Sequence, residues 1–244
     1  MSPRERAERA AAIDWSLYHV TDTGYSGGPA RVPEVAAAAV AGGATVIQVR
    51  DKTLDDDALI QLVRACRARI VEEVGVARFE QVPLFVNDRL EVARVTGCHL
   101  HVGQSDDSVA RARGVLGEKV LIGLSTSSAA EVDSAARAEG DARPDVIGIG
   151  PVWVTATKPD AAEPLGIDGL RDRLRVRDAA CSQHPEAPAL PAVAIGGIDR
   201  ERARSVAATG VDGICVVSAI ASAPSPRVAA ARLREEVACA RPQP

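Results

Sequence analysis

The stretch VIGIGPVWVTATK, residues 146–158, indicates the fold of this chain. Its apolar first half, VIGIGPV (146–152), is typical of a short strand buried on both faces of a parallel sheet. Seven other short runs share this character: LYHVTD (17–22), TVIQVR (45–50), PLFVND (83–88), HLHVG (99–103), VLIGLST (120–126), AVAIGGI (192–198) and GICVVSAI (213–220). We therefore predict one buried strand in each of these runs.

Longer amphipathic segments lie between the apolar runs. VPEVAAAAVAGG (32–43), DDDALIQLVRACRARIVEEV (55–74) and RERARSVAATG (200–210) are typical of helices, and two of them end in glycine. Strands that alternate with helices in this way predict an α/β protein, a closed (β/α)8 TIM barrel. An open doubly wound sheet is the main alternative, but the first strand–helix turn, DTGYSGG (22–28), is not its GxGxxG fingerprint.

The repeating pattern predicts a single domain over residues 1–244. Residues 3–12 are expected to form an extra helix within a leading segment, 1–14, before the first strand. The segment RDAACSQHPEAPALP (177–191) is rich in proline and polar residues and predicts a long surface loop. It is not interpreted as a domain boundary, because the strands on either side belong to one pattern.

Composition excludes several classes of protein. A formal net charge of −4 does not supply the basic face that nucleic acid needs. No apolar run approaches the roughly 20 residues of a membrane span, and the charged start, MSPRERAERAAAIDW (1–15), lacks the apolar region of a secretion signal. The five scattered cysteines form no CxxC pair and favour free thiols in a reducing cytoplasm. We expect a cytoplasmic protein with no nucleic-acid or membrane partner. Assembly into a homo-oligomer is possible on these observations.

The low aromatic content also predicts the kind of core. Trp, Tyr and Phe together make up 2% of the residues, whereas the hydrophobic fraction is 46%. We therefore expect a core built from Ala, Val, Ile and Leu.

Polar side chains follow the predicted strands at the end where a TIM barrel has its active site. They are Gln48, Arg50 and Lys52 after the second strand; Asn87 and Asp88 after the third; Asp106 after the fourth; Ser125 after the fifth; and Thr155, Thr157 and Lys158 after the sixth. The seventh and eighth strands lead into Gly197, Val217 and Ser218. We expect these residues to meet at one mouth.

These residue types suit phosphorylated ligands. Arg and Lys neutralise phosphoryl oxygens, and Asp88 and Asp106 are hard oxygen ligands suited to Mg²⁺, which also takes substrate phosphates. The Gly-Gly turn and the backbone amides after the eighth strand resemble the phosphate site of many such barrels. Two regions that would bind anionic groups at one mouth predict two phosphorylated substrates.

Less specific explanations exist for single residues. Asn87 and Asp88 could cap the following helix, and His101 is interpreted as a packed or supporting histidine rather than a catalyst. The sequence has no zinc-ligand spacing and no GxSxG nucleophile elbow. We therefore expect no catalytic dyad, and the agreement of several strand ends carries more weight than any one of them.

Seven motifs follow one another along the chain: QVRDK (48–52), VND (86–88), HVGQSD (101–106), LST (124–126), GPVWVTATK (150–158), AIGGI (194–198) and VVSAI (216–220). This set resembles the thiamine phosphate synthase family over nearly the whole barrel. This resemblance implies an Mg²⁺-dependent transferase that joins hydroxymethylpyrimidine pyrophosphate to hydroxyethylthiazole phosphate and releases pyrophosphate.

The resemblance also implies a role for each matching residue. Arg50, Lys52, Asn87 and Lys158 would hold the pyrophosphate, Asp88 and Asp106 the Mg²⁺, and Gln48 and Ser125 the pyrimidine; Thr155 and Thr157 would lie at the thiazole, and Gly197, Val217 and Ser218 at the thiazole phosphate. Arg50, Lys52, Lys158 and Ser125 would be the catalytic residues. An aminopyrimidine can stabilise the methylene cation left by pyrophosphate, so no protein nucleophile would be required.

The chain departs from the family pattern at a few positions. Ser127 stands where members usually carry His, and Val154 replaces a common proline. The approach to the fourth strand, GCHLHVG (97–103), is about one residue short, so the assignment of Asp106 depends on a small gap. Two other functions stay open: a thiazole tautomerase relative, which would need the missing His, and a non-catalytic sensor of phosphorylated ligands, in which the metal and pyrophosphate residues would be eroded.

Overall fold

The computed structural model describes residues 1–157, 162–183 and 187–240. Its centre is a closed parallel barrel in which each strand pairs with the next along the chain and β8 pairs with β1. The strands are β1 (Leu17–Val20), β2 (Val46–Val49), β3 (Leu84–Asn87), β4 (His99–Val102), β5 (Ile122–Thr126), β6 (Val146–Ile149), β7 (Ala192–Ile195) and β8 (Gly213–Val216). Each lies in one of the eight predicted runs, so the TIM-barrel prediction is confirmed.

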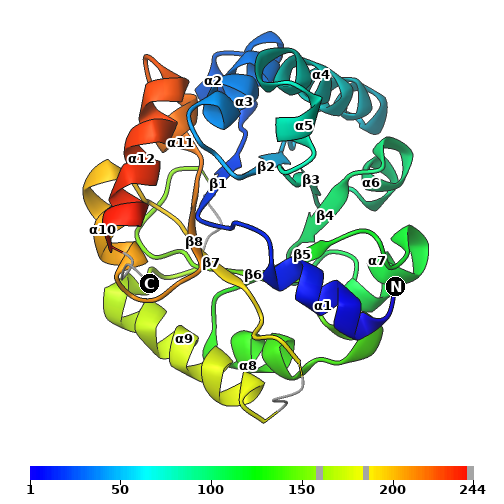
Figure 1. Cartoon of the computed structure of the whole chain (residues 1–244), viewed down its shortest axis with the longest axis vertical. Helices are drawn as coiled ribbons and strands as arrows, with labels where there is room; N and C mark the ends of the chain where they lie inside the picture. The colour runs from blue at the N-terminus through cyan, green and yellow to red at the C-terminus, as the bar shows by residue number, and fades with distance from the viewer. Residues whose placement is uncertain (158–161, 184–186, 241–244) are drawn as a thin grey trace.

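Helices surround the barrel (Figure 1). They are α1 (Pro3–Ala11), α2 (Thr23–Ser26), α3 (Val32–Ala41), α4 (Asp56–Val74), α5 (Val76–Phe79), α6 (Leu90–Thr96), α7 (Val109–Leu116), α8 (Ala129–Arg137), α9 (Gly166–Cys181), α10 (Arg200–Ala207), α11 (Ser218–Ala221) and α12 (Pro226–Ala240). Side chains cap several of them: Asp55 accepts a hydrogen bond from Ala58 N at the start of α4, and Ser128 and Glu131 form a capping box on α8.

The apolar residues form two layers. The larger layer packs Val, Ile, Leu and Ala between the strands and the helices. The smaller layer fills the barrel interior and contains three of the six aromatic residues, Trp15, Tyr18 and Phe85, whose rings lie 5.7–6.2 Å apart. The expectation of a core built from Ala, Val, Ile and Leu is therefore wrong for the interior, where few side chains must fill a wide space.

Helix α1 covers the amino-terminal end of the barrel, and Figure 1 shows it lying across the strands near β5 and α7. Arg6 is buried and donates to Asp145, with 3.2 Å between Nε and Oδ1, and Asp145 also accepts from Arg113 at 2.6 Å. Trp15 Nε1 donates to Ala10 O at 2.9 Å. The extra N-terminal helix is thus present, and it closes the end opposite the mouth.

The structure changes one expected boundary. Residues 177–181 were expected in a long loop, but α9 continues through Cys181. Arg177 explains this extension, because its Nη1 donates to Asp212 Oδ2 at 2.8 Å and to Leu190 O at 3.2 Å, and Ala180 is buried. Residues 182–183 and 187–191 lie outside helices and strands, and residues 184–186 lie outside the described residues.

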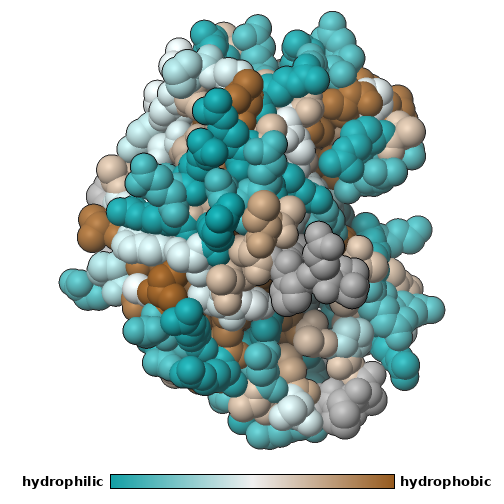
Figure 2. All heavy atoms as spheres, turned by 60° about the vertical axis from the view of Figure 1, so that its left-hand side comes forward, coloured by the Kyte–Doolittle hydropathy of each residue, from teal (hydrophilic) through white to brown (hydrophobic). Residues whose placement is uncertain are grey.

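The surface seen in Figure 2 is mostly hydrophilic, and its hydrophobic residues form separate groups. Among the described residues, no helix combines the length and the apolar character that crossing a membrane requires.

Candidate active site

A cavity of about 430 Å³ lies at the carboxyl ends of the strands. Its lining includes twelve of the thirteen residues singled out from the sequence: Gln48, Arg50, Lys52, Asn87, Asp88, Asp106, Ser125, Thr155, Thr157, Gly197, Val217 and Ser218. The thirteenth, Lys158, lies outside the described residues. The barrel thus gathers residues that are as far apart in the chain as Gln48 and Ser218 around one space.

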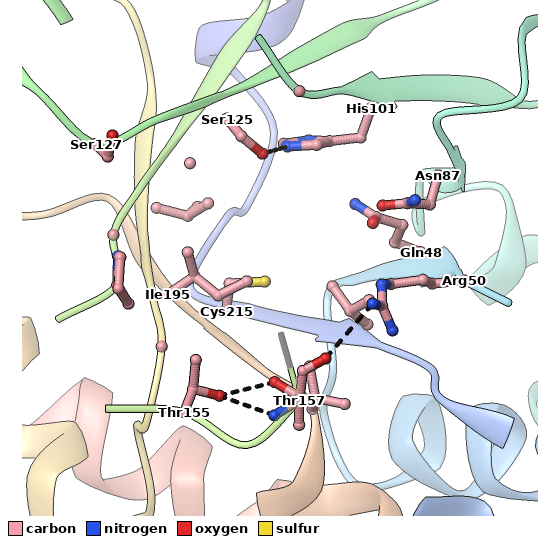
Figure 3. A pocket seen from close by; sticks show the side chains of 18 of the residues that line it. Gln48, Arg50, Asn87, His101, Ser125, Ser127, Thr155, Thr157, Ile195 and Cys215 are labelled. Atoms are coloured by element: carbon pink, nitrogen blue, oxygen red, sulfur yellow. Dashed lines mark hydrogen bonds between the residues drawn. The ribbon is translucent and has the colours of Figure 1, made fainter. Parts of the chain in front are cut away.

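The cavity wall at β1–β3 presents amide groups. Figure 3 shows Gln48 and Asn87 side by side, with both side chains directed into the cavity. Gln48 Nε2 donates to the hydroxyl of Tyr18 at 2.8 Å, and burial raises the pKa of Tyr18 well above its usual value. Because the phenol stays protonated, it holds Gln48 by a neutral hydrogen bond and leaves the amide oxygen for a ligand.

Arg50 joins two loops across the mouth. Its Nη1 donates to Asp22 Oδ2 at 2.9 Å, and its Nη2 donates to Thr157 O at 3.5 Å, as Figure 3 shows for the second contact. Asp22 also accepts from Tyr25 N at the start of α2. The guanidinium is therefore held at the rim between the loops that follow β1 and β6.

Two carboxylates and one ammonium group meet where the chain leaves β2, β3 and β4. Asp88 directly follows β3 and has φ 60°, which makes it the one non-glycine residue with positive φ in the described ranges. Burial raises the pKa of the Asp88 carboxyl, and the neighbouring Asp106 carboxyl, which shares a hydrogen bond with it, raises this pKa further. Lys52 Nζ lies 3.7 Å from Asp88 Oδ2. Left-handed backbone at a non-glycine residue often marks a functional position.

The carboxylates of Asp88 and Asp106 have the character of a site for a divalent cation. The structure brings the Asp88 and Asp106 carboxylates together despite the gap before β4, and their mutual repulsion is what a bound cation would relieve. No group of three or more His, Cys, Asp or Glu side chains suited to a metal occurs in the part of the chain that the structure describes. Two carboxylates with open positions fit Mg²⁺, which usually keeps waters and takes phosphate oxygens as further ligands.

Ser125 is held at both ends. Its hydroxyl lies 3.0 Å from His101 Nε2 (Figure 3). Its carbonyl accepts from Gln104 Nε2 at 2.7 Å. The parallel register places Gly123 opposite His101, and a Cβ at Gly123 would lie 2.3 Å from His101 Nδ1. The glycine therefore makes room for the imidazole. The contact agrees with the interpretation of His101 as a packed or supporting histidine.

Hydroxyl groups and a glycine turn form the opposite wall. Thr155 Oγ1 and Thr157 Oγ1 lie 2.8 Å apart, and Figure 3 shows this pair across the cavity from Ser125. The turn Gly196–Gly197 follows β7 with φ 104° and 62°, and a Cβ at Gly197 would lie 2.7 Å from Val154 O. Only glycine combines this backbone with so close an approach.

Several lining residues were not predicted from the sequence. Among them are Tyr18, Cys215 and Glu131. Tyr18 and Cys215 lie on strands at inward-facing positions, so the two-residue alternation along each strand could have found them. Glu131 Oε2 accepts from Ser127 N at 2.7 Å and from Ser127 Oγ at 3.0 Å. The Ser127 hydroxyl is therefore already bonded to Glu131, whose carboxylate also belongs to the α8 capping box.

Comparison with known proteins agrees with this arrangement. Residues 17–220 match a family model described as Thiamine monophosphate synthase. The chain is 42% identical over 226 residues to Thiamine-phosphate synthase of Chloroflexus aurantiacus, a match that covers 92% of this chain and 94% of that protein. The structure of Thiamine phosphate pyrophosphorylase from Pyrococcus furiosus has a TM-score of 0.75 and 29% sequence identity, covering 93% of this chain and 97% of that one.

Some relatives are much longer. The chain is 41% identical over 223 residues to Thiamine biosynthesis multifunctional protein ThiED of Corynebacterium efficiens, and the match covers 90% of this chain but 28% of that protein. The chain thus spans little more than a quarter of that relative. The family model matches most of the barrel, and relatives of similar length are about 40% identical. The chain therefore belongs to the thiamine monophosphate synthase family, a family of transferases.

Proposed function

We propose that this protein is a thiamine phosphate synthase. It joins 4-amino-2-methyl-5-hydroxymethylpyrimidine pyrophosphate to 4-methyl-5-(2-hydroxyethyl)thiazole phosphate and releases pyrophosphate. The observation that carries the proposal is that Arg50, Lys52, Asp88 and Asp106 line the same cavity as Gly197. One cavity thereby offers a cationic and acidic rim for a diphosphate with its metal, and a separate backbone turn for a second phosphate.

The diphosphate half of the site is proposed to lie at β2–β4. Arg50 and Lys52, which line the cavity, would contact diphosphate oxygens, and Asn87 would donate its amide N–H. Lys158, which lies outside the described residues, is proposed from the sequence as a further cation. Asp88 and Asp106 would hold Mg²⁺. When bound there, Mg²⁺ supplies positive charge that stabilises the leaving pyrophosphate.

The organic rings are proposed to lie deeper in the cavity and along its β6–β8 wall. Gln48 and Ser125 would hydrogen-bond the aminopyrimidine, because both are held by neighbours that fix their orientation. Thr155 and Thr157 would line the thiazole. Gly197, Val217 and Ser218 would receive the thiazole phosphate through backbone N–H groups and a hydroxyl.

The proposed reaction needs positioning and charge stabilisation rather than a protein nucleophile. The C–O bond between the methylene carbon and the diphosphate breaks, and its electron pair leaves with pyrophosphate. The aminopyrimidine stabilises the resulting methylene cation, and the thiazole nitrogen then forms the new C–N bond. In this scheme Ser125 orients the pyrimidine and His101 orients Ser125, so their contact at 3.0 Å serves binding and not attack.

Two alternatives are less well supported. A thiazole tautomerase would need a proton-transferring His where this chain has Ser127, and the Ser127 hydroxyl is bonded to Glu131 instead. A non-catalytic sensor would not need the Asp88, Asp106, Lys52 and Arg50 group, yet all four line the cavity. Assembly with further copies and a cytoplasmic location stay predictions from the sequence.

The decisive experiment supplies both substrates with Mg²⁺ and measures pyrophosphate release together with thiamine phosphate. The proposal expects product only when both substrates are present. Calorimetric titration with pyrophosphate, with and without Mg²⁺, separates the alternatives, because a tautomerase or a bare thiazole binder should give no metal-dependent heat. A protein that forms no thiamine phosphate under these conditions is not a synthase.

A further inference from the structure

The side chain of Arg202 connects α10 to the glycine turn after β7. Its Nη1 donates to Gly197 O at 2.6 Å. Its Cζ atom lies 4.9 Å from the centroid of the Trp153 ring, in the geometry of a cation–π contact. Asp199, which caps α10 by accepting from Arg202 N at 3.0 Å, fixes the start of the helix that carries this arginine.

The opposite side of the turn is fixed by backbone groups. Trp153 N donates to Gly196 O at 3.0 Å, and Val152 N donates to Ile195 O at 2.9 Å. A Cβ on Gly197 would lie 2.8 Å from the Trp153 Cβ, so the turn and the Trp153 backbone are in close contact. Arg202 thus bonds to Gly197 in the turn and stacks on Trp153, against which the turn packs.

We infer that Arg202 is a positioning residue for the phosphate-binding turn, an inference that rests on the proposed role of Gly197 in holding the thiazole phosphate. In a trans peptide, the C=O of one residue and the N–H of the next point in opposite directions. By holding Gly197 O, Arg202 therefore fixes the direction of the Ile198 N–H, and Ile198 lines the cavity. Arg202 acts through the peptide plane without touching the substrate.

A surface ion pair alone would not explain this geometry. Arg202 Nη1 also lies 3.9 Å from Asp199 Oδ2, but the arginine side chain is 43% exposed, and exposed pairs contribute little to stability. Arg200 provides a matched control on the same helix. It is 57% exposed and its Nε lies 3.5 Å from Glu236 Oε1 on α12.

The test compares Arg202→Met, Arg202→Lys and Arg200→Met with the unmodified protein. Methionine keeps most of the aliphatic stem and removes the donor, whereas lysine keeps a donor. For Arg202→Met we expect KM for hydroxyethylthiazole phosphate to rise roughly five- to tenfold, with kcat and KM for the pyrimidine substrate within about twofold, as for loss of a charged hydrogen bond. Arg202→Lys should recover part of this loss, and Arg200→Met should match the unmodified protein.

Direct titration with hydroxyethylthiazole phosphate adds a readout that does not depend on turnover. Trp153 and Trp15 are the two tryptophans of the chain, and Trp15 is buried in the barrel interior, so a ligand-dependent change in fluorescence reports on Trp153. Equal affinities of Arg202→Met and Arg200→Met would overturn the positioning role, even if the melting temperature of Arg202→Met were lower. Unmodified protein that binds this ligand without any turnover would instead overturn the proposed function and leave the comparison of affinities intact.

Discussion

The imidazole of His101 lies against the hydroxyl of Ser125, with 3.0 Å between Nε2 and Oγ, and the space for the ring is left by Gly123 on the neighbouring strand. Three strand positions therefore depend on one another. The glycine has no side chain, so it leaves space for the ring on β5. The ring in turn sets the orientation of a serine proposed to bind substrate.

Gly123→Ala should disturb this arrangement. The added Cβ would lie 2.3 Å from His101 Nδ1, so the ring or the strand must move. We expect kcat/KM for the pyrimidine substrate to fall at least roughly tenfold, since small misplacements near reacting groups are costly. Steady-state kinetics measure the effect. Gly114→Ala is the control, because nothing lies within 4 Å of a Cβ there, and it should leave kinetics unchanged. Unchanged kinetics in Gly123→Ala would contradict the role given to His101.

Asp88→Ala should largely abolish turnover. Removing one of two adjacent carboxylates takes away half of the charge proposed to hold Mg²⁺, so activity should drop steeply at limiting Mg²⁺ and recover only in part when Mg²⁺ is raised. Rates measured over a series of Mg²⁺ concentrations test this. Asp107→Asn, next to Asp106 but paired with Arg111 at 2.7 Å, should behave as the unmodified protein. A near-normal rate of Asp88→Ala at limiting Mg²⁺ would show that the metal assignment is wrong.

Arg6→Met should destabilise the fold without changing the site. Arg6 and Asp145 are both nearly fully buried. Removal of the Arg6 guanidinium leaves the negative charge of Asp145 imperfectly compensated. We expect the free energy of unfolding to fall by roughly 3 kcal/mol, as for other broken buried pairs. Urea unfolding followed by circular dichroism gives the value. Arg4→Met removes an exposed pair with Glu8 and should cost less than about 1 kcal/mol; equal losses in the two variants would exclude a special role for the buried pair.

Stability should decline on acidification through the partly buried side chain of His99. Burial lowers the pKa of His99 to about 4, with further contributions from Arg9 and Arg113. Because the unfolded chain takes up this proton near pH 6.5, the stabilisation is complete above that pH and is lost as the pH falls from 6.5 towards 4. The loss is on the order of 3 kcal/mol at most.

His99→Asn isolates this contribution. Asparagine can still accept the hydrogen bond from Leu121 N, which lies 3.1 Å from His99 Nδ1, but it does not titrate. Urea unfolding at pH 7.5 and pH 4.5 should therefore show a smaller loss in His99→Asn than in the unmodified protein. Carboxylates that also titrate between these pH values are present in both proteins, so their contribution to the loss of stability is the same in each. Parallel losses would mean that His99 does not couple to folding.

The strands and the chemistry of the rim could be predicted from the sequence alone. A strand buried on both faces must be a short apolar run, and parallel strands that follow one another around a barrel bring their carboxyl ends to one rim. This is why residues as distant as Arg50 and Gly197 were expected at one mouth and are found lining one cavity. The type of each side chain then indicated phosphate and metal chemistry before any contact was known.

Contacts between side chains were decided by the tertiary structure. The pairing of His101 with Ser125 depends on barrel register and on the space above Gly123, and the bond from Arg202 to Gly197 depends on where α10 begins. The extension of α9 to Cys181 likewise depends on Asp212, which is distant in the chain. Apolar patterning sets which face of an element is buried, but contacts of this kind require atoms from separate elements to meet within a fraction of an ångström, and no local pattern encodes that distance.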